Sequence, residues 1–449
     1  MPRSSSLASV HLDVNEEPQE LPRQEPDTPF RILVAGNFSG GASRIRKPVL
    51  VDRDSFEEVL DLYGPEIRLE FARNPVDIHF RELDDFHPDS LFERLPPFQA
   101  LRNLRQQIEE GAIPAEEPSL GKLSGADLLS TMMGEAPATA PAREQSAFDA
   151  MLQEMVAPYA EPKPDRRQPA MIAQTDEAIS GEMRGVLHHP KYQDLESLWR
   201  GLFFLIRRLE TSPELKVYVW DMPQADLLSP EGLAAFRKIA VEETVGTPGA
   251  EPWSVIAGLY YFGNEQESAL AQIAAIARAA GAPFLAGVSR DVVGLAPVFP
   301  TLRRSADARW VGLAMPRFLL RLPYGAKTES TERFAFEEMP EPPEHERYLW
   351  GHPAIACAYL LGTAFTRSGW SMRPGEVSQI DGLPAHVYQK DGEAELKPCA
   401  EVLLTEGSAE LLLERGLMPL LSMKGSDRVR LARFQSIAEP SAPLGGRWS

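Results

Sequence analysis

The fold class is most clearly indicated by a segment that begins with Trp253-Ser-Val-Ile-Ala-Gly-Leu-Tyr-Tyr-Phe262. This stretch is an apolar run of strand length. An alanine-rich helical segment, Glu265 to Ala280, and a second apolar run, Pro283 to Val288, follow it. A strand, a helix and a strand in this order predict a right-handed βαβ unit with parallel strands. The sequence therefore predicts an α/β fold.

The segments around this unit have matching periodicity. Leu215 to Trp220 alternates as a strand does, and Trp310 to Met315 is a further apolar strand candidate. Helical patterns cover 173–186, 195–209 and 354–365, and the second of them carries an unusually wide apolar face. We therefore expect a larger α/β block over residues 170–438, followed by a disordered tail at 439–449.

A smaller mixed α/β block is predicted for residues 30–110. Arg31 to Ala35 is an apolar strand that enters a glycine-rich turn, and Lys47 to Val51 is a second short strand. Asp54 is the expected N-cap of a helix. Val76 to Phe80 alternates as a half-buried strand, and a further helix begins near Pro88.

Two segments of different composition flank the smaller block. Residues 1–29 are polar and rich in Pro and Glu, which predicts a disordered leader. Residues 111–169 are rich in Pro and Ala and are predicted to be a linker with two short amphipathic helices, Ser124 to Met133 and Phe148 to Val156.

Composition limits the function. Acidic residues outnumber basic ones by 65 to 46, and a net charge of -19 disfavours binding to nucleic acid. The sequence has no run of eighteen apolar residues, so we expect no direct membrane insertion. Two cysteines, Cys357 and Cys399, fit a reducing cytosol and predict a cytoplasmic protein. We expect Cys357 to be an inert thiol in an apolar helix, whereas a thiolate at Cys399 could be stabilised by its position after Lys397.

Few residues suggest catalysis. The turn Gly36-Asn-Phe-Ser-Gly-Gly41 follows a strand, but Ala42-Ser43 stands where a phosphate-binding loop needs its lysine and hydroxyl. We interpret it as a plain turn. His188 and His189 are adjacent and cannot chelate one ion together, so we expect a role at a helix end. We predict no cofactor and no enzymatic activity.

A short acidic segment offers a second candidate. Asp84, Asp85, His87 and Asp89 could be metal ligands, with His79 on the preceding strand. A helix start explains these residues more simply, because carboxylates there bind free N–H groups.

The smaller block resembles the small subunit (TssB, or VipA) of the type VI secretion contractile sheath. The resemblance is carried by runs in matching order. They are Pro29-Phe-Arg-Ile-Leu-Val-Ala-Gly-Asn-Phe-Ser-Gly40, Arg46-Lys-Pro-Val49, Val51-Asp-Arg-Asp-Ser-Phe56, Phe80-Arg-Glu-Leu-Asp-Asp-Phe-His-Pro88 and Leu95-Pro-Pro-Phe-Gln-Ala-Leu101.

The larger block resembles the large sheath subunit (TssC, or VipB). The matching runs include Leu187-His-His-Pro190, Leu195-Glu-Ser-Leu-Trp-Arg-Gly-Leu202, Pro316-Arg-Phe-Leu-Leu-Arg-Leu-Pro-Tyr-Gly325 and Tyr348-Leu-Trp-Gly351. The resemblance implies a small-subunit-like and a large-subunit-like block that together mimic a sheath heterodimer. It also implies a structural role, with sheath subunits, inner tube protein and baseplate proteins as partners.

The resemblance has two departures and one further implication. The two subunits share one chain here, and the family's large subunit continues beyond the point that corresponds to Ser449, so a sheath-derived adaptor, cap or baseplate component is an alternative to a sheath protomer. The family's recycling ATPase binds a short helix near the start of the large subunit. The comparable stretch here suggests Leu128, Leu129, Met132 and Met133 as a recognition helix, with a locally packed linker helix as the alternative.

Two other function classes remain open from the sequence. One is a cytosolic α/β enzyme with a pocket between Gly36–Gly41 and Asp84–Asp89. The other is a non-polymerising protein-binding module, favoured if its strand edges are covered.

Overall fold

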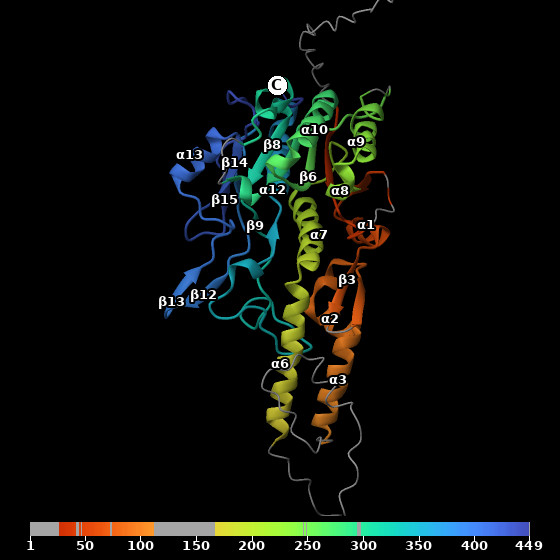
Figure 1. The fold of residues 1–449 in the computed structure, drawn as a ribbon, viewed down its shortest axis with the longest axis vertical. Helices are drawn as coiled ribbons and strands as arrows, with labels where there is room; N and C mark the ends of the chain where they lie inside the picture. Colours follow the sequence, from red (N-terminus) through yellow and green to blue (C-terminus); the bar gives the residue numbers. More distant parts are fainter. Residues whose placement is uncertain are drawn as a thin grey trace, which may run out of the picture.

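The computed structural model describes residues 27–41, 45, 47–71, 74–111, 167–245, 247, 249–293 and 298–448. Its centre is a nine-stranded sheet (Figure 1). The strands are, in spatial order, β11 (Gln379–Ile380), β15 (Val429–Leu431), β14 (Leu417–Ser422), β8 (Val311–Met315), β7 (Phe284–Val288), β6 (Val255–Phe262), β1 (Phe30–Gly36), β5 (Leu215–Asp221) and β2 (Val49–Val51).

The six strands from β14 to β5 are parallel. Strand β2 at one end of the sheet, and β15 and β11 at the other, run antiparallel to their neighbours. The predicted βαβ unit is present as β6, α10 (Glu267–Ala280) and β7, with β6 and β7 paired in parallel. The α/β fold class predicted from the sequence is confirmed.

Helices cover both faces of the sheet. Besides α10, the described helices are α1 (Phe56–Tyr63), α2 (Pro88–Arg94), α3 (Pro96–Glu109), α6 (Gln168–Leu187), α7 (Pro190–Arg208), α8 (Gln224–Leu227), α9 (Pro230–Arg237), α11 (Arg290–Val293), α12 (Pro353–Ser368) and α13 (Glu406–Glu414). The hydrophobic core on one face includes side chains of α7 and α12, and the core on the other includes those of α9 and α10.

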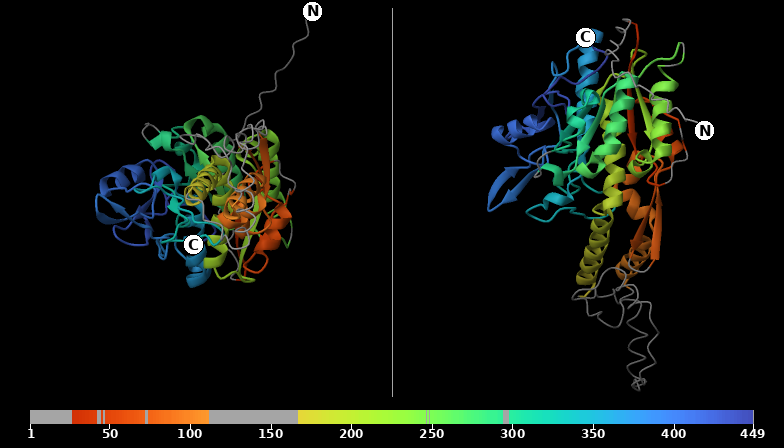
Figure 2. Two further views of the ribbon diagram at one scale, coloured as in Figure 1. Left: turned by 90° about the horizontal axis from the view of Figure 1, so that it is seen from below. Right: turned by 45° about the horizontal axis from the view of Figure 1, so that its top comes forward.

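Three strand pairs lie outside this sheet. They are β3 (Glu66–Phe71) with β4 (Asn74–His79), β9 (Phe318–Leu319) with β10 (Trp350–Gly351), and β12 (Val387–Lys390) with β13 (Glu393–Leu396). In Figure 1, α3 and α6 run side by side away from the sheet, and Figure 2 shows the same pair from a second direction.

Strand β1 joins the smaller block to the larger one. It comes from residues 30–110, yet it lies between β5 and β6 of the larger block and pairs in parallel with both. Its side chains alternate between the two cores: Ile32 and Val34 face one, and Leu33 and Ala35 face the other. An apolar run without polar alternation is what a strand buried on both faces requires.

Two details differ from the sequence-based expectations. The N-cap of α1 is Ser55 and not Asp54, and the Asp52 carboxylate accepts hydrogen bonds from the backbone N–H groups of both residues. The C-terminal residues expected to form a disordered tail pack against the body instead, where Leu444 and Trp448 are buried. Apolar side chains spaced among prolines gave no periodic signal there.

Among the described residues, no helix combines the length and apolar character needed to cross a membrane.

Candidate functional site: the junction between the two blocks

An aromatic cluster fixes the smaller block against α7. The indole N–H of Trp199 donates to the carbonyl of Phe38 at 2.9 Å, and its ring packs edge-on against Phe38, Phe56 and Tyr63. The Tyr63 hydroxyl donates to the Val219 carbonyl of β5 at 2.9 Å. Buried aromatic residues with a bonded polar group contribute both apolar area and a fixed orientation. The cluster therefore sets how the two blocks sit on each other.

The glycine-rich turn after β1 is a structural joint. The Ser39 N–H donates to the Asp221 carboxylate at 3.1 Å, and the Ser39 carbonyl accepts from the Glu66 N–H of β3. Gly40 has a φ of +73°, and a Cβ there would lie 2.5 Å from the Glu66 carbonyl oxygen. The glycine is needed for close packing on β3, which agrees with the plain turn expected from the sequence.

The acidic segment 84–89 serves the same junction. The Asp89 carboxylate accepts from the backbone N–H groups of Glu332 and Arg333 at 2.8 and 3.0 Å, and so binds a loop of the larger block. Asp85 forms an ion pair with Arg94. The side chain that caps α2 is His87, whose Nδ1 accepts from the Asp89 N–H. The Asp85 carboxylate accepts from the backbone N–H groups of Arg81 and Glu82 at the start of the short 3-10 helix Leu83–Phe86. A carboxylate therefore does bind free N–H groups at a helix start in this segment, although α2 itself is capped by His87.

The loop that Asp89 binds also stacks on α2. The Phe334 and Phe92 rings lie 4.6 Å apart at an interplanar angle of 29°. The exposed Arg333 and Glu93 form an ion pair at 2.6 Å beside them.

A buried charge cluster holds the base of this loop. The Arg321 guanidinium lies between two fully buried carboxylates, 2.9 Å from Glu196 of α7 and 2.7 Å from Glu338. Arg200 adds a second cation at 2.7 Å from Glu196. Burial alone would raise the pKa of Glu338, but the opposing charge of Arg321 and hydrogen bonds, first from His188, hold it at about 2. Both carboxylates and both guanidiniums are thereby paired.

This cluster was missed from the sequence. Its one sequence signal is Arg321 itself, a charged residue inside the apolar run Phe318-Leu-Leu-Arg-Leu322. A charge in such a run requires a buried partner. Its partners lie 125 residues before it and 17 residues after it, so local patterns could not identify them.

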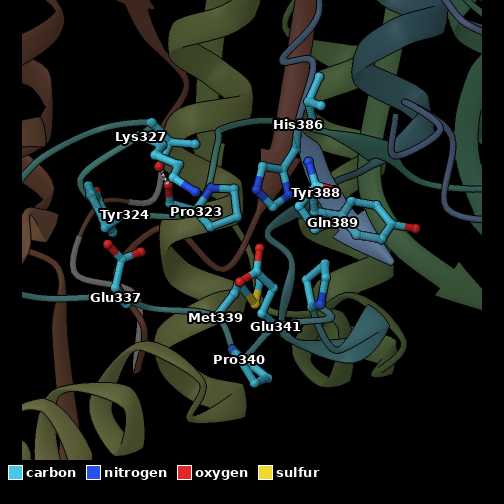
Figure 3. A pocket seen from close by; sticks show the side chains of 13 residues that line it. Pro323, Tyr324, Lys327, Glu337, Met339, Pro340, Glu341, His386, Tyr388 and Gln389 are labelled. Atoms are coloured by element: carbon cyan, nitrogen blue, oxygen red, sulfur yellow. Dashed lines mark hydrogen bonds between the residues drawn. The ribbon is translucent and has the colours of Figure 1, made fainter. Parts of the chain in front are cut away.

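A groove of about 640 Å³ lies between this loop and β12 (Figure 3). Its walls combine proline, aromatic and methionine side chains with a few charged groups. The lining residues are Pro323, Tyr324, Lys327, Thr328, Glu337, Met339, Pro340, Glu341, Pro343, His386, Val387, Tyr388 and Gln389.

A second pocket, of about 610 Å³, lies where β1 and β6 end. Asn37 and Gly40 of the turn line it, together with Asp194 and His352. The segment 84–89 is absent from its lining, so the two features that the enzyme interpretation would combine do not meet there. Burial lowers the pKa of His352 to about 3, so the ring is neutral, and it is held by Tyr260 and by the start of α12.

The remaining candidate residues are structural. His188 ends α6 with its Nε2 3.3 Å from Glu338, whereas His189 acts at the start of α7, where its Nδ1 accepts from the Lys191 N–H. Cys357 and Cys399 are buried, and burial raises the pKa of their thiols to about 12 and about 11. The expectation that a thiolate at Cys399 could be stabilised is therefore wrong.

The suggested recognition helix with Leu128, Leu129, Met132 and Met133 lies outside the described residues, as does Phe148 to Val156. Its role stays a prediction.

Comparisons with known proteins match two parts of the chain to two families. Residues 169–298 and 297–438 match the VipB (EvpB) tail sheath N-terminal domain, and residues 10–114 match the type VI secretion system VipA family. The type VI secretion system sheath protein TssC1 of Pseudomonas aeruginosa is 33% identical over 307 residues. The match covers 61% of this chain and 61% of that relative.

Proposed function

Because this chain belongs to the type VI secretion tail sheath family, we propose that it is a structural component of a contractile apparatus of that kind. It acts as a sheath protomer or as a sheath-derived adaptor, cap or baseplate component. On this proposal the protein is cytoplasmic and non-enzymatic, and its surfaces contact protein neighbours.

The observation that carries the proposal is the position of β1. A strand of the VipA-like block lies in the interior of the VipB-like sheet, with β5 and β6 on its two sides. Two sheath-type units that share one sheet in one chain form a preassembled building block with fixed 1:1 composition. Such a unit suits a repeating lattice, because a head-to-tail interface between identical units generates rings or filaments.

The proposed partners follow from the family. They are other sheath subunits, the inner tube protein and baseplate proteins. The recycling ATPase is a further proposed partner through Leu128, Leu129, Met132 and Met133. The domain division into 30–110 and 170–438, joined by 111–169, is part of the same proposal.

Electron microscopy of the purified chain, alone and mixed with inner tube protein, tests the proposal. Tubules or rings support a sheath protomer. Monomers that bind the end of a preformed sheath or a baseplate support the adaptor. A monomer that binds neither sheath, tube nor baseplate proteins contradicts both forms of the proposal.

A further inference from the structure

The β12–β13 hairpin is held mainly at its base. Among the described strands it pairs only with itself, and the Val387 side chain is 60% exposed. The two chain ends of the hairpin, near His386 and Lys397, meet residues 345–350. Because residues 386–389 also line the groove of Figure 3, the base contacts decide where one wall of that groove stands.

One base contact has a defined proton state. The Lys397 Nζ lies 2.9 Å from the His345 Nδ1 and sits over the rings of Tyr348 and Trp350, at 4.8 and 5.9 Å from their centroids. An ammonium group only donates hydrogen bonds, so Nδ1 must accept. We therefore assign the neutral form to His345, with its proton on Nε2.

The second base contact tolerates either proton state. The His386 Nδ1 lies 2.6 Å from the Tyr348 hydroxyl. If His386 gains a proton, the hydroxyl can turn and accept, so the contact survives. Burial, then the charge of Lys397, lowers the pKa of His386, and Glu338 opposes this. The His345–Lys397 contact is the sensitive one.

Charges from four segments face His345. Burial lowers its pKa most, and Lys397, directly after β13, lowers it further. Arg290 on α11 and Arg317 act in the same direction, while Glu346 beside it opposes them. The surroundings therefore keep the ring neutral near pH 7 and resist a second positive charge.

We propose that the His345–Lys397 contact is a proton-operated latch, and that protonation of His345 releases the base of the β12–β13 hairpin and opens the groove. A protonated ring has no lone pair for Lys397, and two cations at hydrogen-bond distance repel each other. The closed contact holds the pKa of His345 below its ordinary value, and the released ring regains the ordinary pKa of about 6.5. The open form therefore gains population as pH falls below about 6.5. The device does not depend on the proposed sheath role.

Hydrogen exchange measured by mass spectrometry on the full chain tests the latch. Amides of residues 385–397 are compared at pH 7.5 and 5.5 after correction for the intrinsic exchange rate. We expect several-fold faster exchange of the hairpin at pH 5.5, with β6 unchanged. In His345→Gln, the amide oxygen accepts from Lys397 at both pH values, so the hairpin should stay protected at both.

The matched control is His79→Gln, which changes an exposed histidine on β4 and should keep the response of the unaltered chain. If His345→Gln changes the hydrogen exchange of β6, the Lys397→Met variant is used as the decisive test instead. It removes the cation and should abolish the pH response of the hairpin. The latch is excluded if hairpin exchange in the unaltered chain is the same at both pH values. It is equally excluded if the decisive variant responds to pH as the unaltered chain does.

Discussion

Arg321 brings a positive charge to a place where only 6% of its side chain is exposed, and both of its carboxylate partners are fully buried. Charged groups in such surroundings are tolerated because each is paired with an opposite charge. Removing one leaves an uncompensated charge, which costs far more than the pair contributes. The cluster therefore works as an all-or-none attachment for the loop that reaches α2.

Arg321→Met tests this attachment. We expect a loss of about 3–5 kcal/mol in unfolding free energy, because Glu196 and Glu338 lose their shared partner. Urea unfolding followed by far-UV circular dichroism measures it. Arg428→Met, which removes an exposed cation 2.9 Å from Asp381, should cost less than about 1 kcal/mol. Equal losses of unfolding free energy in the two variants would show that the buried cluster contributes no more to stability than an exposed ion pair.

His352 gives a pH dependence at the same scale. Its folded pKa of about 3 lies below the value of about 6.5 in the unfolded chain. The unfolded chain therefore takes up the proton first, and stability is lost as pH falls below 6.5. At pH 5 the loss is about 2 kcal/mol.

Asn at position 352 can still cap α12 but does not titrate. The His352→Asn variant should therefore be less stable at pH 7.5, and its stability should change less between pH 6.5 and 5. Thermal unfolding across the pH range measures both effects. A slope identical to that of the unaltered chain would contradict this role of His352.

Strand β1 is the element on which both blocks depend. It is buried on both faces, and its hydrogen bonds run to β5 on one side and β6 on the other. A defect in β1 therefore reaches residues that lie more than 200 positions away in the sequence.

Val34→Asp places a carboxylate in the core on the α7 side of the sheet. We expect a loss of more than about 4 kcal/mol, because the charge is buried without a partner. Hydrogen exchange should show lost protection in β6 and β7 as well as in β1. Leu50→Asp is the control in the same block, since Leu50 is 47% exposed on edge strand β2. Full protection of β6 in Val34→Asp would show that the blocks fold separately.

In the whole molecule, the two blocks are held together by noncovalent contacts in addition to the chain that links them. Strand pairing, the aromatic cluster around Trp199 and the 2.7 Å ion pair between Arg105 and Asp176 all join the two blocks. Most of this contact is apolar or backbone bonding, which salt does not screen.

Cutting the chain tests this description. A protease site placed between residues 112 and 166 should yield two fragments that co-elute in gel filtration, in 1 M salt as well as in dilute buffer. Adding Val34→Asp to the cut chain should separate or precipitate them. Fragments of the otherwise unaltered cut chain that separate in dilute buffer would contradict the shared sheet.

Local patterns in the sequence were enough to identify the fold class, the strands at the centre of the sheet, most of the long helices and the family. Those features have local causes. The apolar run at Trp253 to Phe262 indicates a buried strand whatever its neighbours are, and apolar side chains recur at helical spacing in the segment before Gly281. The order of motifs added the resemblance, because several weak matches in a fixed order are specific together.

Three features became evident only from the folded structure: β1 lies between β5 and β6, Arg321 is shared by Glu196 and Glu338, and Lys397 contacts His345. Each of these pairs residues far apart in the chain, and a single sequence carries no record of such distances. Strand order and the partner of a buried charge are set by how surfaces fit after collapse, so periodicity and propensity, which act within a few turns of chain, do not specify them.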